Sequence, residues 1–136
     1  MFVGKKDTEI TDIKHLSFSY STGTMMNASV SYTLDFDDKY VAKIKPNGVS
    51  EEDATLIDFK NEDVMKILDV FKKYQVQKWD GFKKYDKNVL DGNSFYFSVT
   101  FKDGEISADG YMMYPKNYIE VKNELDNIFL NYVKNS

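Results

Sequence analysis

The chain has 136 residues, of which 42% are hydrophobic and 15% aromatic, so it has enough apolar surface for a folded core and is not of the disordered class. Its 22 acidic and 18 basic residues give a net charge of −4, and every basic residue is a lysine, which disfavours nucleic-acid binding through phosphate neutralisation and arginine contacts. The absence of cysteine excludes disulfides and thiolate chemistry, and no apolar run is long enough for a transmembrane segment.

The N-terminal third predicts three strands. We expect a flexible N-terminus over residues 1–8, followed by a single domain over residues 9–136. Alternating apolar and polar side chains predict strands over residues 13–20, 26–36 and 40–44. The turn Asp37-Asp38-Lys39 needs an odd number of residues to keep both apolar sets on one face, so Asp38 or Lys39 should take a positive φ angle.

The middle of the chain predicts a short edge strand at residues 55–59 and then a helix. Asn61 is the expected N-cap, and the helix should end near Gln75. Its apolar stripe consists of Val64, Ile67, Leu68 and Phe71. Two Asp-Gly pairs in residues 79–92 predict an ordered loop with two tight turns, and a second helix is expected over residues 118–133.

Residues 94–113 predict a β-hairpin with a two-residue turn at Asp103-Gly104. The register that follows from this turn places Lys102 opposite Glu105. The same register places Tyr96 opposite Tyr111, Phe95 opposite Met112, and the ring of Phe97 against Gly110.

The element order is strand–strand–strand–(strand)–helix–strand–strand–helix. We therefore predict an α+β fold: a two-layer sandwich in which an antiparallel sheet of five to six strands carries both helices on one face.

Catalytic and metal-binding motifs are not found. His15 is the only histidine, and its position on the polar side of the first strand predicts a surface residue without an aligned nucleophile. The acidic clusters at residues 35–38 and 51–53 do not have the spacing of a calcium loop. We expect no enzymatic activity, no cofactor and no bound metal.

The polar face of the sheet is the strongest candidate for a binding surface, because it is rich in small hydroxyl groups and poor in charge. The alternative is that it is an ordinary solvated sheet face. The candidate partner-binding residues on it are Ser29, Ser31, Thr33, Tyr96, Ser98, Thr100, Ser107 and Tyr111. The second candidate is the loop with Trp79 and Phe82, as an aromatic platform for a sugar or peptide; the alternative is that Trp79 fills the core.

The leading functional hypothesis is a non-enzymatic binding domain whose partner is an unidentified protein or a second copy of the chain. One alternative is an acidic inhibitor-type protein, such as an immunity or anti-defence factor, that caps a basic partner. Another is an enzyme with an unrecognised carboxylate site. The expected location is cytoplasmic for the chain as it stands and extracytoplasmic for a chain from which a leader was removed.

Several short motifs in the second half resemble an uncharacterised family of small bacterial α+β domains, which often form the extracytoplasmic part of lipoproteins or stand alone. These motifs cover about a third of the chain: Trp79-Asp80-Gly81-Phe82, Val89-Leu90-Asp91-Gly92, Phe95, Phe101, Asp103-Gly104, Ile106, Ala108, Gly110, Pro115 and Asn117-Tyr118. The resemblance implies no activity, so it assigns no functional residue, and the chain lacks the lipobox cysteine and apolar leader of the lipoprotein members.

Overall fold

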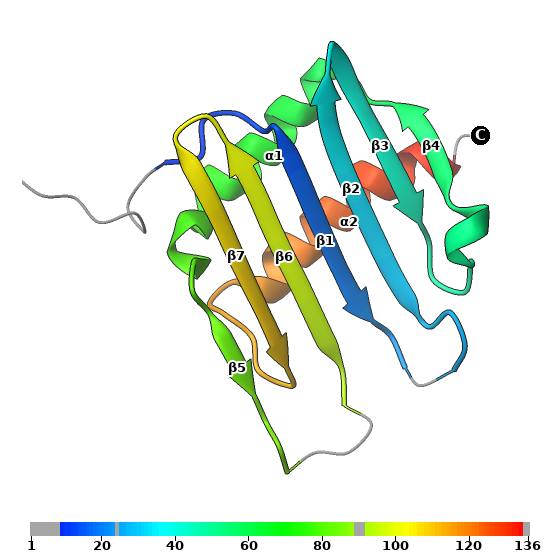
Figure 1. Ribbon diagram of the computed structural model, residues 1–136, viewed down its shortest axis with the longest axis vertical. Coiled ribbons are helices and arrows are strands. Elements are labelled where there is room, and N and C mark those ends of the chain that lie inside the picture. Colours follow the sequence, from blue (N-terminus) through cyan, green and yellow to red (C-terminus); the bar gives the residue numbers. More distant parts are fainter. Residues whose placement is uncertain (1–8, 24, 89–91, 135–136) are drawn as a thin grey trace, which may run out of the picture.

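The computed structural model describes residues 9–23, 25–88 and 92–134, which form one sheet with both helices on the same side (Figure 1). The helices are α1 (Asn61–Tyr74) and α2 (Tyr118–Lys134), and two short 3₁₀ helices span Glu51–Asp53 and Val76–Trp79. The strands are β1 (His15–Ser21), β2 (Ser29–Asp37), β3 (Lys39–Lys45), β4 (Thr55–Asp58), β5 (Lys83–Tyr85), β6 (Ser94–Phe101) and β7 (Gly104–Tyr111).

The strand order in the sheet is β4-β3-β2-β1-β6-β7-β5, and every neighbouring pair is antiparallel except β5 and β7. The predicted α+β class is confirmed, but the sheet has seven strands rather than five to six. The unpredicted strand is β5, which lies in the segment expected to be a loop. Its three residues are all exposed, so they carry no apolar alternation from which a strand could be predicted.

The core lies between the sheet and the two helices. The even-numbered residues of β1 and the odd-numbered residues of β6 point towards the helices and are buried. Phe97 packs edge-on against Phe18 at 6.2 Å and against Phe71 of α1 at 5.7 Å, while Tyr32 of β2 stacks on Phe129 of α2 at 4.5 Å. Because burial of each such side chain stabilises by about 1.5–3 kcal/mol, these rings fix both helices to one face.

The β2–β3 hairpin confirms one prediction and corrects another. Asp38 has a φ of 71°, as an odd-length turn requires, and Phe36 lies opposite Tyr40. However, β2 begins at Ser29 rather than at Met26. The backbone turns at Asn27, whose φ is 61°, so Met26 lies outside the strand and is 89% exposed.

The β6–β7 hairpin has the predicted faces, but its predicted register is wrong by two residues. Phe101 pairs with Gly104, so the turn residues are Lys102 and Asp103, and neither has a positive φ. The carboxylate of Asp12 accepts the backbone N–H of Lys102 at 3.1 Å and holds the turn in this position. A shift of two residues preserves the alternation, which explains why the inward and outward sets were still predicted correctly.

Gly110 makes room for Phe95, not for Phe97 as the predicted register implied. A Cβ atom at Gly110 would lie 2.2 Å from the carbonyl oxygen of Met113 and 2.8 Å from the Phe95 ring. We therefore expect Gly110→Ala to lower the free energy of unfolding, measured by urea denaturation, by about 3 kcal/mol through overpacking. Gly104→Ala is the matched control, because its Cβ would make an ordinary contact of 3.6 Å with Phe101. Equal losses in the two variants would contradict this explanation.

Helix α1 starts at Asn61, one residue earlier than it would if Asn61 were the N-cap. Lys60, not Asn61, is the N-cap, and its side chain makes no capping hydrogen bond. The backbone N–H of Lys60 instead donates to the Tyr132 hydroxyl of α2 at 3.1 Å, and Tyr132 donates to Asp63. Burial and the bond to Asp63 raise the pKa of Tyr132 to about 12. A side chain of the second helix therefore caps α1, because the N-cap residue of α1 makes no capping hydrogen bond with its own side chain.

Candidate functional site

The face of the sheet that the helices leave open carries the predicted hydroxyl groups in register. Across the strands, Thr33, Ser17, Ser98 and Ser107 form one row, and Ser31 lies next to Ser19 in the neighbouring row. All of these side chains are half-buried. We call this surface the hydroxyl face; its members are Ser17, Ser19, Ser29, Ser31, Thr33, Tyr96, Ser98, Thr100, Ser107 and Tyr111.

One end of the hydroxyl face is hollowed. A shallow depression of about 310 Å³ lies over the ends of β1, β2 and β6. Its lining contains six serines: Ser17, Ser19, Ser21, Ser29, Ser31 and Ser94. The ammonium of Lys45 is buried nearby, where it donates to the carbonyl oxygen of Ser29 at 2.6 Å and of Asn27 at 3.2 Å. This lysine therefore braces the rim instead of presenting a free charge.

The two tyrosines of the hydroxyl face do not lie opposite each other, contrary to the prediction. The two-residue register difference pairs Tyr96 with Asp109, and Tyr111 with Ser94. Tyr96 is 44% exposed. The phenol oxygen of Tyr111 accepts the backbone N–H of Gly92 at 2.7 Å, so this side chain anchors the segment before β6.

Asp109 forms a small charged cluster that the sequence did not predict. Its carboxylate accepts hydrogen bonds from Lys83 at 3.0 Å and from the Tyr85 hydroxyl, both on β5. The bond from Tyr85, followed by that from Lys83, lowers the pKa of Asp109, and the same bond raises the pKa of Tyr85. The cluster fastens the short edge strand to β7 and pairs the charge of Lys83 with that of Asp109.

The Trp79 loop does not form an exposed platform. Trp79 is 3% exposed, and its indole N–H donates to the carbonyl oxygen of Lys116 at 3.0 Å. Its ring packs edge-on against Phe97 at 5.2 Å, while Phe82 is half-buried against Phe95. Asp80 accepts the backbone N–H of Ser107 at 3.0 Å and so ties this loop to β7. Of the two interpretations of Trp79, the core position is the one observed.

His15 has more aligned neighbours than the sequence predicted. Its Nδ1 lies 2.5 Å from Asp35 Oδ1, and the strand register places Thr100 on its other side. The order carboxylate–imidazole–hydroxyl is that of a nucleophilic triad. However, no hydrogen bond joins His15 to Thr100 in the described part of the chain, and neither these two residues nor Asp35 line the depression on the hydroxyl face.

Asp126 of α2 makes the most extensive side-chain network beneath the sheet. Its Oδ1 accepts the hydroxyls of Tyr20 at 2.8 Å and Tyr32 at 2.7 Å, and its Oδ2 accepts Lys122 at 3.1 Å. Burial, followed by the bond to Asp126, raises the pKa of both tyrosines. These hydrogen bonds attach α2 to β1 and β2.

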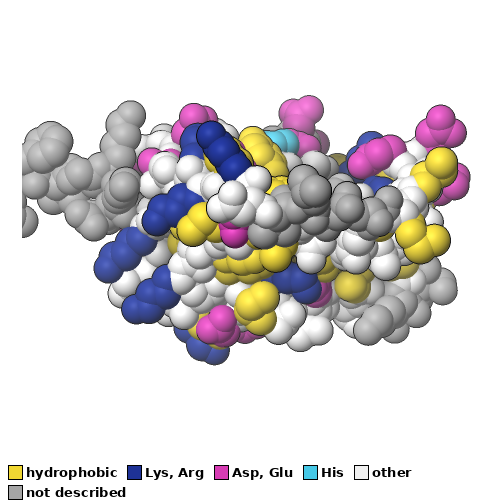
Figure 2. Space-filling view, turned by 90° about the horizontal axis from the view of Figure 1, so that it is seen from below, with side chains coloured by type: hydrophobic (Ala, Val, Ile, Leu, Met, Phe, Trp, Pro, Cys, Tyr) yellow, Lys and Arg dark blue, Asp and Glu magenta, His cyan; other side chains and the backbone are white. Residues whose placement is uncertain are grey.

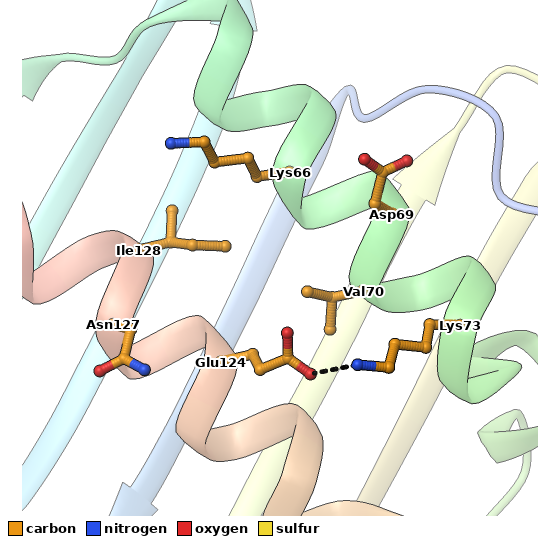
Figure 3. Close-up of a pocket in the computed structure, with 7 residues that line it drawn as sticks. All are labelled: Lys66, Asp69, Val70, Lys73, Glu124, Asn127 and Ile128. Atoms are coloured by element: carbon orange, nitrogen blue, oxygen red, sulfur yellow. Dashed lines mark ion pairs between the residues drawn. The ribbon is translucent and has the colours of Figure 1, made fainter.

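A groove of about 310 Å³ runs between the two helices on the side away from the sheet. Figure 3 shows Val70 and Ile128 pointing into it, and Lys73 of α1 reaching Glu124 of α2 at 3.7 Å. Asp69 points away from Glu124 in the same view. The two carboxylates therefore do not converge as paired acid–base groups would.

The remaining findings concern metals, membranes and known proteins. Among residues 9–23, 25–88 and 92–134, no group of three or more His, Cys, Asp or Glu side chains is placed to hold a metal ion. No helix in that part of the chain combines the length and the apolar character needed to cross a bilayer.

No protein-family model matches the chain, and no curated protein is significantly similar to it. The resemblance to small bacterial domains stays a prediction.

Proposed function

We propose that the protein is a non-enzymatic interaction domain whose hydroxyl face packs against the same face of a second copy. The observation that carries this proposal is an uncovered sheet face whose centre holds hydroxyl groups and no free charge. Lys45 is bonded to backbone carbonyls, and Lys43 lies 3.5 Å from Glu51. The sheet therefore meets solvent through a surface that costs little to desolvate.

Hydroxyl groups suit an interface in which one surface packs against a copy of itself. A two-fold interface places one patch against itself, so a patch of like charges would repel its copy. A serine or threonine hydroxyl both donates and accepts hydrogen bonds, so two hydroxyl faces can pair without such repulsion. Serine and threonine also lose little side-chain entropy on burial compared with lysine or glutamate.

The size of the face fits a stable dimer. The five long strands β3, β2, β1, β6 and β7 have seven to nine residues each. With strands about 4.8 Å apart and a rise of about 3.3 Å per residue, they cover roughly 600 Å². The flanking edge strands bring this close to the ~800 Å² per partner that is typical of specific interfaces.

The charges at the two borders of the sheet are complementary. Figure 2 shows lysine side chains gathered towards the β5 end of the molecule and acidic side chains towards the β4 end. The β4 end has the exposed residues Glu51, Glu52, Asp53 and Asp58, of which Glu51 pairs with Lys43 and Asp58 with Lys39, and the β5 end has Lys87 and Lys83, which pairs with Asp109. A two-fold axis parallel to the strands would place the acidic border of one copy over the basic border of the other.

Lysine substitution on the hydroxyl face tests the proposal. Ser31→Lys with Ser107→Lys would bury four unpaired ammonium groups per dimer, so we expect at least about 100-fold weaker association in sedimentation equilibrium. The control is Asn123→Lys with Asn127→Lys, which adds the same charge at exposed positions of α2 and should leave association unchanged. A wild-type chain that stays monomeric throughout the micromolar range would overturn the proposal.

Exposed acidic side chains also support the second candidate function, in which the acidic surface caps a basic partner protein. Asp37, Asp38 and Glu52 are exposed and form no ion pair with another described residue. Such binding should weaken steeply as salt increases, because screening acts on exposed charges. Association that is insensitive to salt would favour the hydroxyl face over this candidate.

A further inference from the structure

A lysine-lined pocket lies where α1 ends and α2 begins, away from the hydroxyl face. Its volume is about 670 Å³. Four of its lining residues are the lysines Lys73, Lys78, Lys84 and Lys116, and none is an aspartate or glutamate. Such a concentration of one charge is notable in a chain whose net charge is −4.

Three of these lysines are not neutralised by the protein. Lys73 lies 3.7 Å from Glu124, but Lys78, Lys84 and Lys116 form no ion pair with any carboxylate in the described part of the chain. Like charges that face one pocket raise the free energy of the folded state and concentrate anions there. An anionic ligand would remove this repulsion.

The pocket also presents flat apolar rings beside the lysines. Tyr114, which is 38% exposed, and the half-buried Phe82 line it, whereas Trp79 is 3% exposed and lies behind them. The Trp79 indole is held by its hydrogen bond to the Lys116 carbonyl, so this part of the wall is rigid. Helix α2 starts at Tyr118, and the positive end of its dipole adds to the lysine charges.

We propose that this pocket binds a phosphorylated small molecule with a flat ring, of the nucleotide class. Lysines bind phosphate groups as point charges, and the aromatic wall gives the ring a stacking surface. The volume lies in the range of small-molecule sites, about 300–1,000 Å³, which favours a compact ligand over a macromolecule.

Calorimetric titration of the full chain with ATP, adenosine and tripolyphosphate at low salt tests this proposal, and fluorescence of Trp79, the only tryptophan, provides a second readout. ATP should bind more tightly than either tripolyphosphate or adenosine, because only ATP uses both the lysines and the rings. Lys78→Gln with Lys116→Gln should weaken ATP binding by about 100-fold, since each charge-assisted contact is worth about tenfold.

The matched control is Lys14→Gln with Lys102→Gln, which removes the same charge from exposed positions near the other end of β7. This control should bind ATP like the wild type. Absence of ATP binding, or equal losses in the two variants, would overturn the proposal. Tripolyphosphate binding as tight as that of ATP would overturn the assignment of a ring-bearing ligand.

Discussion

The free energy of unfolding is expected to fall by about 4 kcal/mol for each pH unit above pH 10, because three buried tyrosines stay protonated in the folded state. Burial raises the pKa of Tyr20, Tyr32 and Tyr118 above the ordinary value of 10.0. The unfolded chain ionises these phenols first, so stability that is complete below pH 10 is lost as the pH rises. Urea denaturation at a series of pH values measures this slope.

Two variants separate this effect from general destabilisation. Tyr32→Phe removes one of the three phenols and should reduce the slope by about 1.4 kcal/mol per pH unit. Phe129→Leu changes the ring that stacks on Tyr32 at 4.5 Å and should lower stability by a similar amount at every pH. If stability were constant between pH 10 and pH 11, the buried phenols would not be responsible for alkaline unfolding.

Replacement of Asp126 by alanine is expected to lower the free energy of unfolding by about 4 kcal/mol. The variant leaves the hydroxyls of Tyr20 and Tyr32 without their acceptor, and each unsatisfied buried group costs about 1–3 kcal/mol. It also leaves Lys122, which is 25% exposed, without its carboxylate. Guanidinium denaturation at neutral pH measures the loss.

The control for Asp126→Ala removes both sides of the network. In a chain with Tyr20→Phe and Tyr32→Phe, Asp126→Ala should cost less than half as much, because no hydroxyl is left unpaired. Asp126→Asn keeps one acceptor oxygen and should fall between the wild type and the alanine variant. An additive result, with the same cost in both backgrounds, would mean that the tyrosines do not act through Asp126.

Much of the fold follows from local alternation. The period-2 pattern of residues 94–101 and 104–111 determines which side chains face the helices, and this is independent of where the turn lies. The stripes of α1 and α2 likewise predict their buried faces, including Ile67 and Leu125. The positive φ of Asp38 was predictable because the faces of β2 and β3 require an odd turn.

The features that were not predicted from the sequence depend on contacts between segments that are distant in the chain. The hairpin turn is held by Asp12, which lies 90 residues before Lys102, and α1 is capped by Tyr132 of the other helix. Strand β5 pairs only through its backbone and Asp109, so its sequence of exposed residues carries no pattern. These positions are fixed by tertiary structure rather than by propensity.

The candidate sites were predictable to different degrees. The hydroxyl face follows from the alternation of serine and threonine with apolar residues, and its flatness follows from the short side chains. The lysine-lined pocket was not predictable, because Lys78 and Lys116 come from segments that meet only when α2 packs beside the 3₁₀ helix at Val76–Trp79. Its signal in the sequence is limited to lysines near the ends of helices.

The distance between spin labels tests the proposed face-to-face dimer most directly. Because the chain has no cysteine, a single introduced cysteine can be labelled selectively. A nitroxide on Glu105→Cys lies at the border of the hydroxyl face, and one on Asn127→Cys lies on the outside of α2. With packed layers about 10 Å thick, face-to-face dimers should give about 30 Å or less between Glu105 labels and about 40 Å or more between Asn127 labels. The reverse order of distances, or no dipolar coupling at either position, would contradict the account.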